Sequence, residues 1–84
     1  MTSAIKFPCL FPLKVMGLNQ EAFSSAVLTV FRKHLDPGQF TQSVKSSSSG
    51  KFLSITVTFT AQSQDQLNRI YEELNRHELV VMTL

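Results

Sequence analysis

The stretch Leu-Ser-Ile-Thr-Val-Thr-Phe-Thr at residues 53–60 decides the fold. Apolar and hydroxyl-bearing side chains alternate along its whole length. Because successive side chains of a strand point to opposite faces, the apolar side chains share one face, and the serine and threonines share the other. The pattern predicts a strand in a sheet that is buried on one face and polar on the other.

The residues around this strand predict a hairpin before it and a helix after it. A weaker strand, Phe40–Lys45, is joined to it by the polar run Ser46–Gly50, so a hairpin is the simplest connection. Ser63-Gln64-Asp65-Gln66 fits a helix capping box, and an apolar stripe at helical spacing runs on to about His77. Leu79–Leu84 is a short β-rich run, and we expect it to be the last strand.

The N-terminal half predicts a strand followed by a helix. Met1–Lys6 has no hydrophobic period and is expected to be a flexible tail. The clearer strand is Phe11–Met16, with Gly17 at its end to supply a positive φ. Asn19 is the expected N-cap of a helix over residues 20–35, whose apolar residues recur on one face.

In chain order the elements are β-α-β-β-α-β, which predicts an α+β two-layer sandwich. In its ferredoxin-like arrangement, an antiparallel four-stranded sheet carries both helices on one face. Residues 7–84 then form a single domain, and Pro8 and Pro12, which lack a backbone N–H, are expected at a sheet edge or lead-in. The uncovered face is predicted to carry Lys14, Met16, Ser54, Thr56, Thr58, Val81 and Thr83.

Length and composition restrict the class of protein. The chain has 84 residues, with eight basic and six acidic side chains and a formal charge of +2. A chain of this length forms one domain without an interdomain cleft. Its single cysteine excludes a disulfide framework and a cysteine-rich metal centre. No apolar run reaches the roughly 18 residues of a membrane span, and no signal-peptide pattern is present, so a cytoplasmic protein is expected.

The residue types that carry catalysis or bind metals are scattered along the chain. Cys9 has no histidine or aspartate near it in sequence, although a nucleophile needs a base within hydrogen-bond reach. His34 and His77 end the two predicted helices and are not at a ligand spacing. Glu72 and Glu73 lie on the predicted exposed side of the second helix, where Glu72 is expected to pair with Arg76 and Glu73 with Arg69. We therefore expect no catalytic residue, no metal and no cofactor, and hence no enzyme.

The serine-rich loop has the most ligand-like composition. Lys45-Ser46-Ser47-Ser48-Ser49-Gly50-Lys51 combines hydroxyls, a glycine and two cations, so its N–H groups and lysines can hold an anion. It does not have the spacing of a phosphate-binding P-loop. A mobile, solvated hairpin without a ligand is the alternative for this segment.

Nucleic-acid binding is a further alternative, because RNA-binding domains with a similar sandwich stack bases on aromatic side chains of the central strands. Here, the predicted open face of the 53–60 strand is serine and threonine. A charge of +2 adds little attraction to phosphates. Nucleic acid is therefore an unfavoured partner.

Several separated motifs resemble the YbeD-like family of small uncharacterised bacterial proteins. They are Phe7-Pro8, Lys14-Val15-Met16-Gly17, Val44-Lys45 with Ser47-Ser48 and Gly50, Ser54, and Tyr71-Glu72-Glu73-Leu74. The resemblance runs without evident gaps from Phe7 to Leu84. The family often has a proline where Ser46 stands and a lysine where Ser49 stands, so the hairpin of this chain is looser and less basic.

The resemblance implies a ferredoxin-like fold similar to ACT-type regulatory domains, which bind amino acids or other small effectors where subunits meet. It also implies a role around lipoylation, because members are often encoded near lipoate-attachment enzymes. No activity is established for the family. Carried to this sequence, the effector site centres on the strand-to-helix turn Met16-Gly17-Leu18-Asn19. There, Gly17 lets the backbone approach a ligand, and the start of the following helix favours a carboxylate.

Residues and resemblance together give one expectation about function. The chain is expected to be a non-enzymatic regulatory or accessory domain that binds a small anionic ligand or a partner protein, as a homodimer. The predicted ligand-binding residues are Met16, Gly17, Leu18, Asn19, Lys45, Ser47, Ser48, Gly50 and Lys51. A nucleic-acid-binding accessory domain is the alternative.

Overall fold

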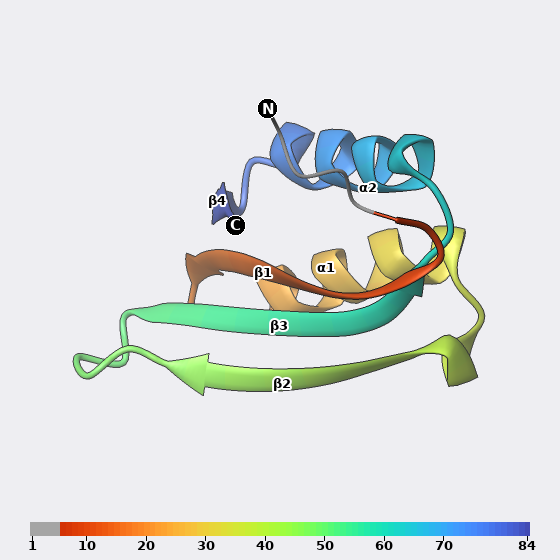
Figure 1. Cartoon of the computed structure of the whole chain (residues 1–84). Helices are drawn as coiled ribbons and strands as arrows, with labels where there is room; N and C mark the ends of the chain where they lie inside the picture. The colour runs from red at the N-terminus through yellow and green to blue at the C-terminus, as the bar shows by residue number, and fades with distance from the viewer. Residues whose placement is uncertain (1–5) are drawn as a thin grey trace, which may run out of the picture.

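The computed structural model describes residues 6–84 and shows four strands and two α-helices (Figure 1). They are β1 (Cys9–Leu18), α1 (Glu21–His34), β2 (Phe40–Ser46), β3 (Phe52–Ala61), α2 (Gln64–Arg76) and β4 (Val80–Thr83), with a 3₁₀ turn at Pro37–Gln39 before β2. The β-α-β-β-α-β order is confirmed. Of the expected tail Met1–Lys6, residues 1–5 lie outside the described residues.

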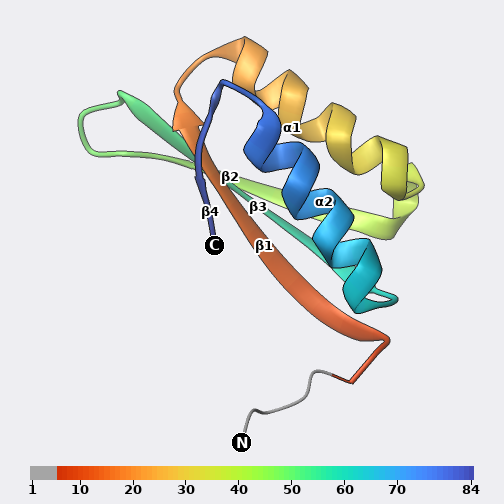
Figure 2. The ribbon, with the colours of Figure 1, turned by 90° about the horizontal axis from the view of Figure 1, so that it is seen from above.

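The four strands form one antiparallel sheet in the order β2-β3-β1-β4. Each helix joins two strands that are separated in the sheet by a third, and both helices lie on the same side of it (Figure 2). Crossovers of one hand produce this arrangement, because they return the chain over the same face. The predicted ferredoxin-like two-layer sandwich is confirmed.

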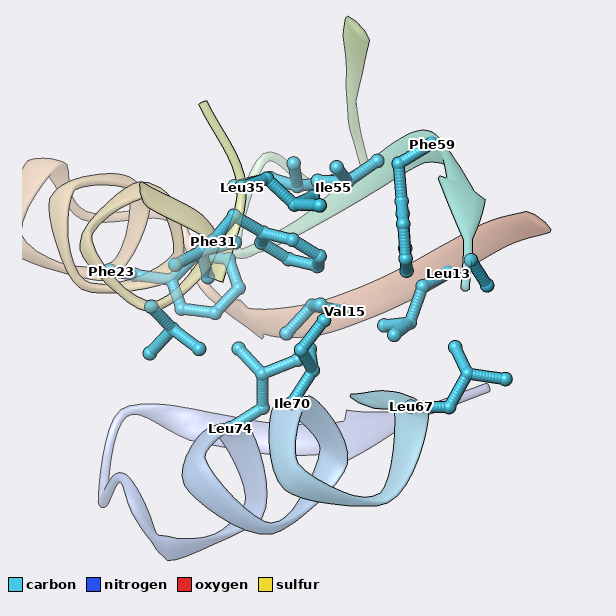
Figure 3. Packing of buried hydrophobic residues seen from close by; sticks show 14 of the residues in the cluster. Leu13, Val15, Phe23, Phe31, Leu35, Ile55, Phe59, Leu67, Ile70 and Leu74 are labelled. Carbon is cyan, nitrogen blue, oxygen red and sulfur yellow. The ribbon is translucent and has the colours of Figure 1, made fainter. Parts of the chain in front are cut away.

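The core lies between the helices and one face of β1 and β3 (Figure 3). On that face, side chains at most 1% exposed belong to Leu13, Val15, Ile55, Val57 and Phe59. They meet the buried helix residues Phe23, Val27, Phe31, Leu67, Ile70 and Leu74. The Phe31 ring contacts Phe40 and Phe59, at centroid distances of 6.1 and 5.8 Å. The alternation at residues 53–60 therefore identifies the buried face correctly.

The first strand is longer than predicted and contains Pro12. Lys14 exchanges both backbone hydrogen bonds with Leu84, at 3.2 and 2.8 Å. Because backbone groups of a strand alternate in direction, the nitrogen of Pro12 points to the same side as that of Lys14. β4 pairs with β1 over Val15–Gly17, so within residues 6–84 no strand lies opposite Pro12 on that side. The proline therefore costs no hydrogen bond to β3, and this half of β1 is a sheet edge, as expected.

Gly17 provides close packing, and the expectation of a positive φ there is wrong. In the described chain, φ is positive at Gly50 (75°) and not at Gly17. A Cβ atom at Gly17 would lie 2.5 Å from the carbonyl oxygen of Leu79 and 2.5 Å from a ring carbon of Phe23. The helix-facing side of Gly17 is therefore filled by the protein itself.

The two helices begin differently. Asn19 was the expected N-cap of α1, but the N-cap is Gln20, which makes no side-chain capping hydrogen bond within the described chain. The strand continues to Leu18, which leaves Asn19 beside the hairpin, where its Nδ2 donates to the Gly50 carbonyl at 2.9 Å. The N-cap of α2 is Ser63, as predicted, and its hydroxyl accepts from the Gln66 backbone N–H at 3.1 Å. The second half of the predicted capping box is wrong, because the Gln66 side chain accepts from the Gln62 N–H at 2.8 Å and not from that of Ser63.

A β-bulge reverses the predicted faces of β4. Gly17 pairs with Val80, but Met16 pairs with Met82, so Val81 is an extra residue in the ladder. Met82 therefore lies on the uncovered face beside Met16. Thr83 was predicted there, but it pairs with Val15 on the helix side, and its hydroxyl donates to the Asn75 side chain at 3.2 Å. Val81 is 63% exposed.

Candidate binding site on the open sheet face

The face of the sheet that points away from the helices is uncovered in the described structure. We call it the open face. It carries Lys14, Met16, Ser54, Thr56 and Thr58, as predicted, because each of these residues alternates with a buried neighbour. None of these five side chains is buried, so the face is accessible to a ligand.

Large apolar side chains also lie on the open face. Leu10 and Phe52 reach it from β1 and β3, and they are 72% and 38% exposed. Met82 and Leu84 reach it from β4 and the chain end, by their pairing with Met16 and Lys14. Among the polar hydroxyls of the central strands, these side chains give a ligand apolar surface to contact.

Charge is segregated between the two layers. All six acidic residues lie in the helices and their turns: Glu21, Asp36, Asp65, Glu72, Glu73 and Glu78. The strands and the β2–β3 hairpin contain only basic charges, at Lys14, Lys45 and Lys51. No ion pair within residues 6–84 involves these three lysines. The open face is therefore a basic surface, because its strands carry lysines and no acidic side chain.

A shallow depression of about 200 Å³ lies at the hairpin end of the open face. Its lining includes Lys14, Met16, Lys45, Ser47, Phe52 and Ser54. The pairing of β1, β3 and β2 brings these residues together, because Ser54 pairs with Met16 on one side and with Lys45 on the other. The Lys51 ammonium also lies over the Phe52 ring, 5.6 Å from its centroid. The ammonium groups of Lys14 and Lys45 can hydrogen-bond an anion, and the Met16 thioether and the Phe52 ring can contact the apolar body of the same ligand.

The structure brings only part of the predicted ligand-binding set into this depression. Met16, Lys45 and Ser47 line it, whereas Gly17 is buried on the opposite face. Asn19 and Gly50 are hydrogen-bonded to each other, and Leu18, Ser48 and Lys51 do not line the depression. Sequence reasoning missed Lys14, Phe52 and Ser54 as site residues. The sequence does place these residues on the same sheet face as Met16. Only the strand register shows that they are neighbours and form a site.

Most backbone N–H groups of the serine loop donate hydrogen bonds within the hairpin itself. Ser47 N–H donates to the Phe52 carbonyl and Gly50 N–H to the Ser47 carbonyl, both at 2.9 Å. The N–H groups of Lys51 and Phe52 donate to the hydroxyls of Ser49 and Ser47, at 3.3 and 3.1 Å. Few loop N–H groups therefore remain for an anion, and the positive charge of this end comes from the lysine side chains.

A larger hollow, about 730 Å³, lies between α1 and α2, and two of its charged lining residues, Lys33 and Glu73, pair with each other, whereas Arg76 forms no ion pair in the described chain. Glu73 accepts from Lys33 Nζ at 3.0 Å and contacts His34 Nε2 at 2.7 Å. Hydrogen bonds from Lys33 and then from His34 hold the pKa of Glu73 below its ordinary value. The expected pairing of Glu73 with Arg69 is wrong, because Arg69 pairs with Asp65 at 2.9 Å. This cluster joins the two helices, and it explains Lys33, His34 and Glu73 without a ligand.

Cys9 and His77 are accounted for by packing and by a turn hydrogen bond, respectively. Cys9 is partly buried against the core at the start of β1. His77 Nδ1 accepts from the Leu79 N–H at 3.2 Å in the turn that follows α2. Within residues 6–84, no three His, Cys, Asp or Glu side chains gather as metal ligands, and no helix is long and apolar enough to cross a membrane.

These features define a class of protein: a small ferredoxin-like domain with a bare, basic sheet face. The chain belongs to the family described as protein of unknown function DUF493, whose model matches residues 2–84. The resemblance to the YbeD-like proteins is thereby confirmed.

Relatives support the same assignment, and solved structures match the fold. The chain is 40% identical over 84 residues to the UPF0250 proteins of Yersinia pestis strain Pestoides F and Yersinia pseudotuberculosis serotype O:3 strain YPIII. Each alignment covers 100% of this chain and 95% of the relative. Two solution structures of protein HP0495 from Helicobacter pylori match the fold with TM-scores of 0.80 and 0.62, at 22% and 23% identity. They match 99% of this chain and 88% and 98% of theirs.

Proposed function

We propose that this protein is a non-enzymatic accessory domain that binds a small anion with an apolar body in the depression on its open face. The observation that carries the proposal is the convergence of Lys14 and Lys45 on Met16 and Phe52, on a face without acidic side chains in its strands. An ammonium group hydrogen-bonded to a carboxylate is a strong, charge-assisted contact. Burial of the ligand's apolar part adds about 25 cal/mol for each Å² removed from water.

An aliphatic carboxylate fits this chemistry better than a bare phosphate. The lining of the depression combines lysines with apolar groups, and the loop offers few N–H groups for a phosphate. Lipoate is a carboxylate on an apolar chain, so the proposal includes the link to lipoate metabolism that the family resemblance implies. We propose that the domain acts as a homodimer in the cytoplasm, where its single cysteine thiol stays reduced.

The test is a thermal-shift titration with lipoate and octanoate, with acetate and glycine as ligands that lack the apolar chain. A ligand that binds only the folded state stabilises it by about 2.7 kcal/mol at a hundredfold excess over Kd, which raises the Tm by several degrees. We expect this shift with the long carboxylates. The double variant K14Q/K45Q should lose it, whereas Arg32→Gln, which removes an exposed charge on α1, should keep it.

Two outcomes contradict the proposal. One is an equal shift with acetate, because the apolar lining then contributes nothing. The other is the absence of a Tm shift with every carboxylate.

The nucleic-acid alternative is tested by titration with a single-stranded RNA oligomer. Phe52 is 38% exposed beside Lys51 and offers one surface on which a base can stack. If the protein binds RNA with an affinity that falls steeply with salt, and binds no carboxylate, the open face is a nucleic-acid-binding surface instead.

A further inference from the structure

The two edges of the sheet are unlike each other. On the β4 side, Pro12 turns its nitrogen outward beyond the end of β4, so an added strand would find a donor missing. At the other edge, β2 contains no proline and pairs with β3 in a ladder without a register shift. Six of its seven residues are exposed. Figure 1 shows β2 as the outer strand, with nothing beyond it. The β2 edge has neither a proline nor a bulge to block strand addition, and Lys45 is its one charged side chain.

The hydrogen bonds of the hairpin show which backbone groups of β2 point outward. Ser47 N–H donates to the Phe52 carbonyl of β3. Backbone groups alternate along a strand, so Ser43 and Lys45 also point to β3. The N–H and C=O groups of Phe40, Gln42, Val44 and Ser46 therefore point away from the sheet, and each of the four residues has a donor to offer.

This edge is complementary to itself. Antiparallel pairing of two β2 strands about Ser43, the midpoint of the strand, places Gln42 opposite Val44 of a second copy and Phe40 opposite Ser46 of that copy. All of these residues point outward, so every pair exchanges two backbone hydrogen bonds, about eight in total. Lys45 comes to lie opposite Thr41 of the second copy, so like charges do not face each other.

We propose that two copies of this chain join along β2 into one eight-stranded antiparallel sheet, with both helix layers on the same side. Val44, which lies on the helix side and is 54% exposed, then meets its counterpart diagonally across the two-fold axis. The Lys45 side chains of both copies lie on the shared open face, which continues the basic surface across the junction. The inference rests on the homodimer of the proposed function and names its interface.

The experiment combines sedimentation with amide hydrogen exchange over a wide range of protein concentrations. A single strand pair buries little surface, so the dimer is expected to form only at high concentration. With rising concentration, the mass should approach twice that of the monomer. The outward amides of Gln42, Val44 and Ser46 should become protected, whereas those of Ser43 and Lys45 should be protected throughout.

A pair of variants at one position isolates the edge. Val44→Pro removes an outward N–H without touching the ladder to β3, so it should abolish the dimer and leave the protection of Ser43 unchanged. Val44→Thr keeps both the N–H and the β-branched shape, and it should still dimerise. If Val44→Pro fails to fold, Gln42→Pro makes the same test at the next outward position.

A protein that stays monomeric at the highest concentration, or a proline variant that dimerises like the wild type, overturns the inference. The proposed function fails separately. If the protein is a monomer and binds the carboxylate, only the proposed dimer is wrong. If it is a β2-linked dimer and binds no carboxylate, only the proposed ligand is wrong.

Discussion

The two faces of the central strands β1 and β3 are formed by alternate residues of the same stretches of sequence, but they have opposite roles. On the helix side, the strand side chains are apolar and at most 1% exposed over the middle of the sheet. On the open side, the intervening residues are hydroxyls, lysine and methionine, and none of them is buried. The acidic residues all lie in the helix layer, where Lys33 and Arg69 pair with two of them, while the sheet lysines have no acidic partner in the described chain.

This difference separates what specifies the fold from what is free to bind. Replacing a residue on the helix side opens a cavity or forces a clash, so stability decides which side chains are tolerated there. The open side contributes little to the core, so its lysines and its methionine are not explained by folding. The comparison can be tested by neighbouring residues that differ only in the face they occupy.

The largest contrast is expected between Phe59→Ala and Thr58→Ala. Phe59 is 1% exposed and contacts the rings of Phe11 and Phe31, so its truncation should lower the free energy of unfolding by about 3–5 kcal/mol. Thr58, the preceding residue, points to the open face, and its replacement should stay within about 0.5 kcal/mol. Urea denaturation measures both values. Equal losses would mean that the two faces are not distinct.

A smaller effect is expected from Gly17→Ala. The added methyl group would meet the Leu79 carbonyl oxygen, which is backbone, and the buried Phe23 ring, so overpacking should cost about 1–3 kcal/mol. Gly38→Ala is the matched control, because a Cβ atom there has nothing within 4 Å. Thermal denaturation of the two variants compares them directly. A neutral Gly17→Ala would show that the helix side of Gly17 has room, and it would restore this glycine as a point of ligand approach.

The smallest effect concerns the ion-pair cluster between the helices. The pKa of Glu73 is lowered by Lys33 and His34 in the folded state, so the stabilisation is fully present above the unfolded value near 4.5. It is lost as the pH falls through the folded value. Glu73→Gln should remove this acid-dependent part, less than about 1 kcal/mol because the side chains are partly exposed.

Glu72→Gln is the control for this prediction, because Glu72 is exposed and forms no ion pair within residues 6–84. Its stability should follow the wild-type curve from neutral pH down to acid unfolding. The expected difference between the two variants should narrow as the pH falls below 4.5. If Glu73→Gln and Glu72→Gln give the same curve, the cluster between the helices does not contribute to stability.

Most of the fold could be predicted because local patterns agree with it. The alternation at residues 53–60, the two apolar helix stripes and the cap at Ser63 all depend on neighbours close in sequence. What failed depends on partners far away. The bulge at Val81 shifts the last strand relative to β1, and no local pattern in Leu79–Leu84 reveals it. Likewise, Glu73 prefers Lys33 on the other helix to Arg69 on its own.

The candidate site shows the same limit. Met16 and Lys45 belong to separate motifs in the sequence, and only the register through Ser54 makes them neighbours. Gly17 had the residue type expected of a ligand turn, but its space is filled by Phe23 from the following helix. Strand order and packing decide these points, and both are properties of the folded chain.

The most direct test of the account is an NMR titration of the protein with octanoate that follows every backbone amide. We predict that the shifts concentrate at Lys14, Met16, Lys45, Phe52 and Ser54, on the open face, and that they vanish in the K14Q/K45Q variant. Shifts confined to the hollow between α1 and α2, or no shifts at saturating ligand, would contradict the claim that the open face is the binding surface.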